Sequence, residues 1–110
     1  MNTRDKQIVK YINKHFRELQ DEVSQMNGFD DFVKGGPLTK AVKMDILQIG
    51  ECINNLTDEG KVQLNAKDLR GIADVRNHIA HGYITIDDQI IWEVILVRLP
   101  ELIKQINSIK

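Results

Sequence analysis

Apolar residues return at every third or fourth position along most of this chain, and this period constrains it to fold as amphipathic helices. One stripe, within residues 3–26, is formed by Ile8, Ile12, Phe16, Leu19, Val23 and Met26. A second, within residues 37–56, is formed by Leu38, Val42, Ile46, Ile49, Ile53 and Leu56. Met44 and Leu47 widen the second stripe, so we expect this helix to pack on two sides in the centre of the molecule.

Capping and turn residues set the helix ends in the first half of the chain. Thr3 can cap the first helix, and Asn27-Gly28 stops it. A short amphipathic segment follows at residues 29–33. The break at Gly35-Gly36-Pro37 then starts the central helix, because proline is well tolerated in a first turn.

The second half of the chain has similar boundaries. Residues 57–60 end the central helix as a turn, and a polar linker leads to a fourth helix over about 66–81. Gly82 suits the left-handed position after that helix, and residues 84–86 form an extended connection. Asp87-Asp88 caps the last helix, whose inward residues are Ile90, Ile91, Val94, Ile95, Leu99, Leu102, Ile103, Ile106 and Ile109.

These elements predict an all-α fold, an up-and-down bundle of four main helices plus one short helix. Pro100 removes a backbone donor from the last helix and should kink it. With 110 residues the chain can build one core but not two, so we expect a single domain over 1–110.

Composition limits the classes of function. The net charge is −1, so the chain lacks the excess of lysine and arginine that is typical of a general nucleic-acid binder. Any RNA contact must come from a local cluster or from a cleft shared between subunits. Cys52 is the one cysteine, which leaves no internal disulfide and no cysteine-rich zinc site, and its apolar neighbours favour a small core residue.

We expect a cytoplasmic protein without membrane association. No apolar run approaches the ~18 residues of a membrane span. The charged residues 1–6 do not resemble the start of a secretory signal.

The segment Arg76-Asn77-His78-Ile79-Ala80-His81-Gly82-Tyr83 holds the strongest chemical signal in the sequence. Arginine offers a planar fork of donors that suits phosphate. Histidine can act as acid or base near neutral pH. Together these groups are sufficient to cut RNA without a metal: one imidazole takes the 2′-hydroxyl proton, and a guanidinium holds the charge that builds on phosphorus.

Helix geometry complicates this site. Residues five apart are separated by about 140° around an α-helix, so Arg76 and His81 do not share one face. Either the long arginine reaches round the helix, or an arginine and a histidine from two chains complete one site. The second arrangement would make activity depend on dimerisation.

Other interpretations of the segment stay open. Arginine, asparagine and histidine near a helix C-terminus commonly cap its last carbonyls, and Tyr83 could simply be a half-buried packing residue. Asp74, His78 and His81 line one helix face and could hold a divalent metal, although i and i+7 lie about 10 Å apart along a helix.

The first helix offers no further candidate. His15 lies beside its apolar face and receives no role. Four charged residues of this helix are interpreted as a solvated face: Arg17, Glu18, Asp21 and Glu22.

The spacing Arg-x4-His-x-Tyr resembles the signature of the HepT branch of the HEPN nuclease toxins. Further segments resemble the same family in order along the chain. They are Ile49-Gly50-Glu51, Asn55-Leu56-Thr57, Leu69 to Asn77, Ile86-Asp87, Ile91-Trp92-Glu93 and Leu99-Pro100-Glu101-Leu102. The resemblance spans roughly residues 38–106, and the first helix fits only in pattern.

The resemblance implies a small helical bundle that forms a homodimer, with both copies of the segment lining one cleft. It implies a metal-independent ribonuclease toxin that cuts tRNA or mRNA, needs no cofactor and pairs with a nucleotidyltransferase antitoxin of the minimal MNT kind. By the same resemblance Arg76 and His81 are the nuclease residues, Asn77 and His78 support them, and Tyr83 is the target of AMPylation. The chain departs from the family pattern by carrying His78 and by lacking an upstream proline–tryptophan pair.

Two rival classes remain. The chain could be a non-catalytic HEPN module that docks a nucleotidyltransferase or binds nucleotides, or a plain helical dimerisation domain. The presence of Arg76, His81 and Tyr83 together favours the enzyme, since an adaptor does not need that trio.

Overall fold

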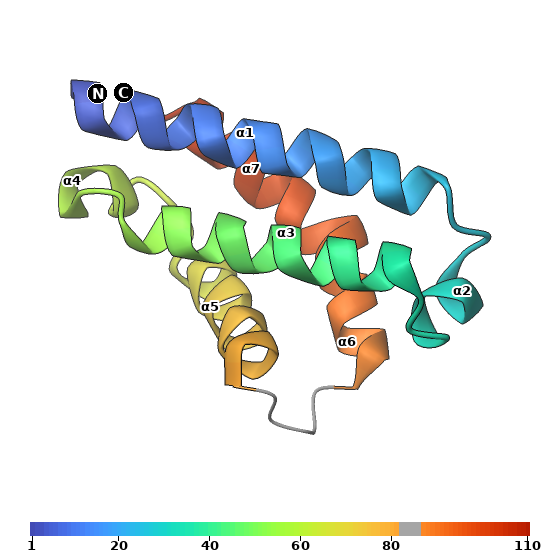
Figure 1. Cartoon of the computed structure of the whole chain (residues 1–110). Coiled ribbons are helices and arrows are strands. Elements are labelled where there is room, and N and C mark those ends of the chain that lie inside the picture. Colours follow the sequence, from blue (N-terminus) through green and yellow to red (C-terminus); the bar gives the residue numbers. More distant parts are fainter. Residues whose placement is uncertain (82–86) are drawn as a thin grey trace.

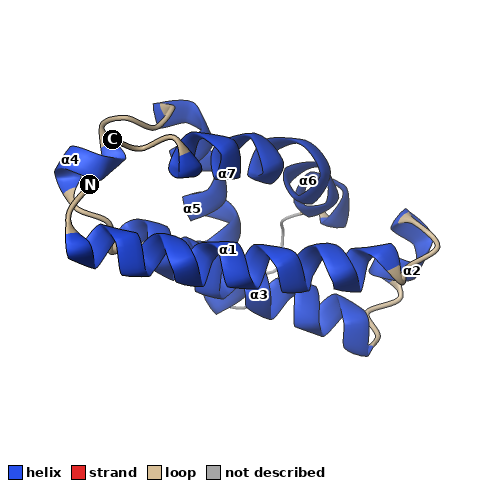
Figure 2. Ribbon diagram, turned by 90° about the horizontal axis from the view of Figure 1, so that it is seen from above, coloured by secondary structure: helices blue, strands red, loops and turns tan. Residues whose placement is uncertain are grey.

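The computed structural model of the protein describes residues 1–81 and 87–110 (Figures 1 and 2). Its elements are α1 (Thr3–Ser24), α2 (Phe29–Val33), α3 (Pro37–Asn54), α4 (Asp58–Lys61), α5 (Ala66–His81), α6 (Asp88–Glu93), the π-helical turn η1 (Val94–Arg98) and α7 (Leu99–Asn107). The described residues contain no strand, so the predicted all-α class is confirmed. Among these helices, none is long and apolar enough to cross a bilayer.

The longest helices, α1 and α3, run antiparallel and pack side by side (Figure 1). Helix α3 also contacts α2 and α5, which confirms its predicted central place. The continuous run α6–η1–α7 closes the bundle against α5 and α1 and brings the C-terminus next to the N-terminus (Figure 2). The whole arrangement is the predicted bundle, with α4 as a second short helix that the sequence analysis treated as a turn.

The predicted apolar stripes form the core. Most residues of the stripes on α1, α3 and α7 belong to one buried cluster or pack against it as partly buried side chains, and the cluster also includes Phe32 of α2 and Ile72 and Val75 of α5. Leu38 of the α3 stripe is only half-buried and lies outside it. Two predictions of burial were wrong: Met44 and Ile90 are 54% and 51% exposed. Both lie at the margin of an apolar stripe, where helical period alone cannot say whether a neighbouring element covers the side chain. Cys52 packs against the core as expected, and burial raises the pKa of its thiol.

The start of α1 differs from its prediction. Asn2, not Thr3, is the N-cap, and its side-chain oxygen accepts a hydrogen bond from the Asp5 N–H at 2.7 Å. Asp5 itself is buried, and its carboxylate accepts bonds from the Thr57 backbone N–H at 3.1 Å and the Thr57 hydroxyl at 2.6 Å. Thr57 also caps α4, so one carboxylate joins the beginnings of two helices.

Pro100 produces an irregular helix just ahead of its own position. The chain widens into the π-helical turn Val94–Arg98 and continues as α7 with Pro100 in its first turn. A wider turn accommodates the proline ring and its missing N–H without ending the helix. At the other end of this run, Asp87 caps α6 as predicted, its side chain accepting a bond from the Gln89 N–H. The predictions for Gly82 and residues 84–86 lie outside the described residues.

Candidate active site on helix α5

Helix α5 has the predicted bounds and presents the candidate residues along its C-terminal half. Its first turn is capped by Asn65, whose side-chain oxygen accepts bonds from the N–H groups of Lys67 and Asp68 at 2.9 and 3.1 Å. Ile72 and Val75 are buried and fix the rotation of the helix about its axis. That rotation turns Arg76 toward α3 and leaves Asn77 and His81 exposed.

Arg76 lies over a glycine of α3. A Cβ added at Gly50 would come within 2.7 Å of the Arg76 Cγ and 2.9 Å of its Cβ, so the two helices meet here through the arginine stem and a bare backbone. The next residue of α3, Glu51, forms an ion pair with the Arg76 guanidinium. The side chain remains 30% exposed, so the guanidinium is anchored but still accessible.

Asn77 completes the support of the guanidinium. Its side-chain oxygen accepts a hydrogen bond from Arg76 Nη1 at 2.8 Å. The Arg76 Nε is buried and has no hydrogen-bond partner among the described residues. The arginine is thus held by one charged and one neutral acceptor, from two different helices.

The two histidines occupy different environments. His81 is exposed in the last turn of α5, whereas His78 is half-buried and its Nδ1 has no hydrogen-bond partner within the described part of the chain. Because α5 is a regular helix from Ala66 to His81, the expected angular offset of about 140° between Arg76 and His81 applies. The predicted modification site, Tyr83, lies outside the described residues.

The alternative metal site on α5 finds no support. Asp74, His78 and His81 do not bring one ligand atom each within 4.8 Å of one another. Within residues 1–81 and 87–110, the group that does so is His15, Glu18 and Asp45, on α1 and α3.

A groove between α3 and α5 begins beside the arginine. It has a volume of about 260 Å³ and is lined by Gly50, Ile53, Asn54, Lys61, Leu69, Arg70, Ile72 and Ala73. Gly50 is common to this groove and to the arginine contact, and the groove lining includes two basic residues, Lys61 and Arg70.

Sequence analysis missed the two α3 residues that hold Arg76. Gly50 and Glu51 are part of the Ile49-Gly50-Glu51 segment, which was noted for its resemblance and given no role. The available signal was a glycine inside an otherwise good helix, which commonly marks a close approach of another element.

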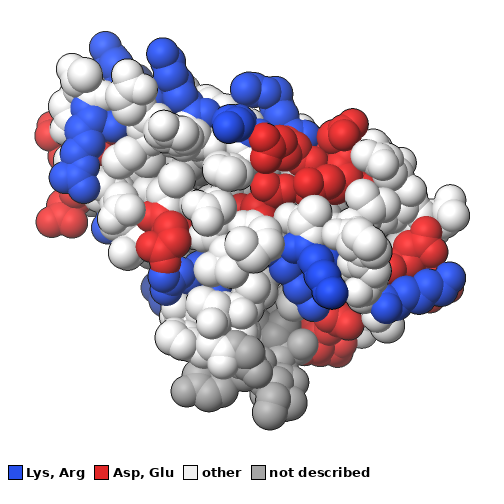
Figure 3. Space-filling view, viewed as in Figure 1, with Lys and Arg blue, Asp and Glu red and all other residues white. Residues whose placement is uncertain are grey.

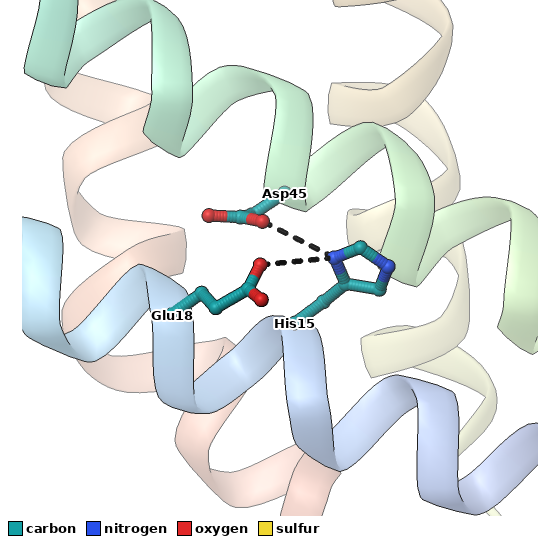
Figure 4. Close-up of side chains that lie close together, drawn as sticks. All are labelled: His15, Glu18 and Asp45. Atoms are coloured by element: carbon teal, nitrogen blue, oxygen red, sulfur yellow. Dashed lines mark hydrogen bonds and ion pairs between the residues drawn. The ribbon is translucent and has the colours of Figure 1, made fainter.

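The expectation of a solvated charged face on α1, formed by Arg17, Glu18, Asp21 and Glu22, was wrong in part. His15 Nδ1 lies 3.2 Å from Asp45 Oδ1 and 3.6 Å from Glu18 Oε2 (Figure 4). Glu22 is partly buried beside Asp45. Burial, and next the neighbouring carboxyl of Asp45, raise the pKa of Glu22 to about 8. Residues 15, 18 and 22 share one face of α1 by helical spacing, which could be seen in the sequence. Their contact with Asp45 could not, because Asp45 lies on another helix, α3.

The fold and the site define a class of protein. It is a small all-α protein in which Arg76 and His81 lie on one helix, α5, and Arg76 is anchored on the central helix α3. The chain belongs to the ribonuclease HepT-like family, whose model matches residues 8–109. This confirms the family resemblance, and membership of a ribonuclease family supports an RNase function.

Two relatives are similar over nearly the whole chain. A protein of Caldanaerobacter subterraneus subsp. tengcongensis named "Putative RNase" is 34% identical over 101 residues, which cover 90% of each chain. One of Methanocaldococcus jannaschii with the same name is 30% identical over 98 residues, covering 89% of this chain and 80% of the relative. No solved structure shows a significant match.

Proposed function

We propose that this protein is a metal-independent endoribonuclease in which Arg76 and His81 carry the chemistry. The observation that supports this most directly is the anchoring of Arg76. In a chain of a ribonuclease family, its guanidinium is held by Glu51 and Asn77 and remains partly exposed. A residue that only capped its own helix would not need a dedicated glycine and a carboxylate from α3.

The chemistry is an internal transesterification. A nitrogen of neutral His81 takes the 2′-hydroxyl proton, the 2′-oxygen attacks the adjacent phosphorus, and the bond to the 5′-oxygen breaks. The leaving oxygen receives a proton, which yields a 2′,3′-cyclic phosphate and a 5′-hydroxyl. Arg76 stabilises the negative charge on the phosphoryl oxygens through charge-assisted hydrogen bonds.

The proposal includes a homodimer with a shared site. Arg76 and His81 lie about 140° apart around α5, so an arginine from one chain and a histidine from the other can face the same phosphate. Helix α6 and the turn η1 expose Ile90, Leu96 and Val97 by 51%, 51% and 62%, and these supply apolar area for an interface.

A nucleotidyltransferase antitoxin is the proposed partner, with Tyr83 as the residue that it AMPylates. The added phosphate would pair with Arg76 and occupy the place of the RNA phosphate. Incubation with that enzyme and ATP should then add one AMP to wild type and none to Tyr83→Phe, as read by mass spectrometry. An adduct on Tyr83→Phe would contradict this assignment.

The test of the nuclease is cleavage of total tRNA and of mRNA by purified protein in EDTA. Wild type should cut and leave cyclic phosphate ends, while Arg76→Ala and His81→Ala should each lose about 10²–10⁴ in rate with unchanged helicity. Asp74→Ala, on the same helix, serves as the matched control and should retain activity. Activity that EDTA and Asp74→Ala both abolish would instead support a metal site on α5. Intact binding of a nucleotidyltransferase without any cleavage would favour the adaptor.

A further inference from the structure

The contact between α1 and α3 contains a convergent set of ligand-type side chains that the proposed ribonuclease chemistry does not use. Helix α1 contributes His15 and Glu18, and α3 contributes Asp45 (Figure 4). One ligand atom from each lies within 4.8 Å of the other two. Asp45 lies 27 positions after Glu18 and 30 after His15, so only the packing of α1 on α3 brings it to them.

Their spacing matches the requirements of a single ion. Ligands at the usual 2.0–2.1 Å from a tetrahedral Zn²⁺ stand about 3.3 Å from each other. His15 Nδ1 lies 3.2 Å from Asp45 Oδ1 and 3.6 Å from Glu18 Oε2. An ion can therefore replace the proton between these atoms with only small side-chain movements.

Asp45 is the most buried ligand of the cluster. Its side chain is 9% exposed, its Oδ1 faces His15, and its carboxyl group also lies beside that of Glu22. Burying a carboxylate without a paired cation is costly. A metal ion bound by the Asp45 carboxylate would supply that cation.

The charge balance of the cluster also favours a divalent cation. Glu18 and Asp45 set two carboxyl groups against the one imidazole of His15, so acidic groups are in excess in the cluster. Figure 3 shows acidic side chains gathered over α1 and α3 on this face.

We propose that His15, Glu18 and Asp45 bind one divalent transition-metal ion, of which Zn²⁺ is the best match in ligand type and spacing. Imidazole nitrogen with carboxylate oxygen is a ligand set for Zn²⁺, Mn²⁺ or Co²⁺ rather than for Mg²⁺. The ion clamps α1 to α3. Its role is structural and separate from Arg76 and His81 on α5, so RNA cleavage in EDTA does not depend on it.

The test measures metal binding and stability of the full chain after removal of metal with EDTA and dialysis. Zn²⁺ should bind with one ion per chain by calorimetry and, at about a hundredfold excess over its Kd, raise the unfolding midpoint by about 10 °C. Mg²⁺ should do neither. Co²⁺ should give visible absorption bands that report the coordinating nitrogen and oxygens directly.

Variants identify the ligands. His15→Gln, Glu18→Gln and Asp45→Asn should each lose the Co²⁺ bands and the stabilisation by Zn²⁺. Asp45 is 9% exposed, so Asp45→Asn could fail to fold, whereas Glu18 is 48% exposed and Glu18→Gln keeps the test valid. His78→Gln is the matched histidine control and should bind as wild type does. Absence of Zn²⁺ binding, or equal binding by His15→Gln, would overturn the proposal. Loss of binding in His78→Gln would move the site to α5.

Discussion

Arg76 shows how a single residue depends on its neighbours on another helix. Its stem rests on Gly50, and its charge is met by Glu51 and by the side-chain oxygen of Asn77. The contact at Gly50 involves the Cβ and Cγ of Arg76, which cannot swing away as the far end of a flexible side chain can. Position 50 therefore controls where the guanidinium lies.

Gly50→Ala should reduce both stability and nuclease activity. The new methyl group would lie 2.7 Å from the Arg76 Cγ, so α5 must shift or Arg76 must change rotamer, at a cost of about 1–3 kcal/mol. We expect a loss of activity greater than the loss of folded protein, measured as cleavage rate against a denaturant curve. Gly36→Ala is the control, because a Cβ there meets nothing within 4 Å, and it should leave cleavage unchanged. Full activity of Gly50→Ala would show that the position of Arg76 is not critical.

Glu22 should make stability depend on pH. Its pKa is raised from 4.5 to about 8 in the folded chain, so between these values the folded state binds more protons than the unfolded state. The free energy of unfolding must then fall as pH rises through this window. The cost of ionising Glu22 in the folded chain is absent below the window and complete above it. Glu22→Gln should raise the melting temperature at pH 8.5 and change it little at pH 5.

The measurement is thermal unfolding across this pH range in EDTA, so that metal binding does not contribute. Asp74→Asn, at an exposed position on α5, is the control for the general loss of one negative charge. If the two variants shift the profile equally, the effect belongs to net charge and not to the buried carboxyl of Glu22.

Among the helices, α1 and α4 are joined by a contact that no pattern in the sequence predicts. Asp5 is 2% exposed and accepts two hydrogen bonds from Thr57, which lies 52 residues away. Its place in the first turn of α1 also puts its charge near the positive end of that helix. The Asp5 carboxylate thus holds the first turn of α1 against Thr57, the residue that caps α4.

Asp5→Ala should destabilise the fold by about 2–3 kcal/mol, since it leaves the partly buried Thr57 N–H and hydroxyl without their acceptor. Urea unfolding measures this change. Asp30→Ala, which removes an exposed carboxylate from the first turn of α2, should cost less than about 1 kcal/mol. Equal costs for the two variants would mean that the contact between Asp5 and Thr57 contributes nothing beyond a helix-end charge.

At the scale of the whole molecule, the shared site can be tested by complementation. In a heterodimer of Arg76→Ala and His81→Ala chains, one composite site lacks both groups and the other retains both. If the site combines two chains, coexpression of the inactive variants should restore about a quarter of wild-type activity, from statistical assortment in a twofold dimer. If each chain forms its own site, the mixture stays inactive. A heterodimer isolated with two different affinity tags makes the comparison direct.

The helical class, most helix bounds and the placement of Arg76 and His81 on one helix could be predicted from the amino-acid sequence alone. Periodicity, caps and breakers are local properties of the chain, and they are encoded within a few residues of where they act. The burial of stripe centres such as Ile12 and Ile49 followed for the same reason, whereas the margins at Met44 and Ile90 did not.

The contacts between helices could not be predicted in this way and became visible only in the folded chain. The support of Arg76 by Gly50 and Glu51, the burial of Asp5 against Thr57, and the cluster of His15, Glu18 and Asp45 each join helices that are distant in sequence. These contacts depend on how the helices are rotated and set against one another. The rotation and placement of each helix are set by the packing of all the core side chains together, so they cannot be deduced from any one segment of the sequence.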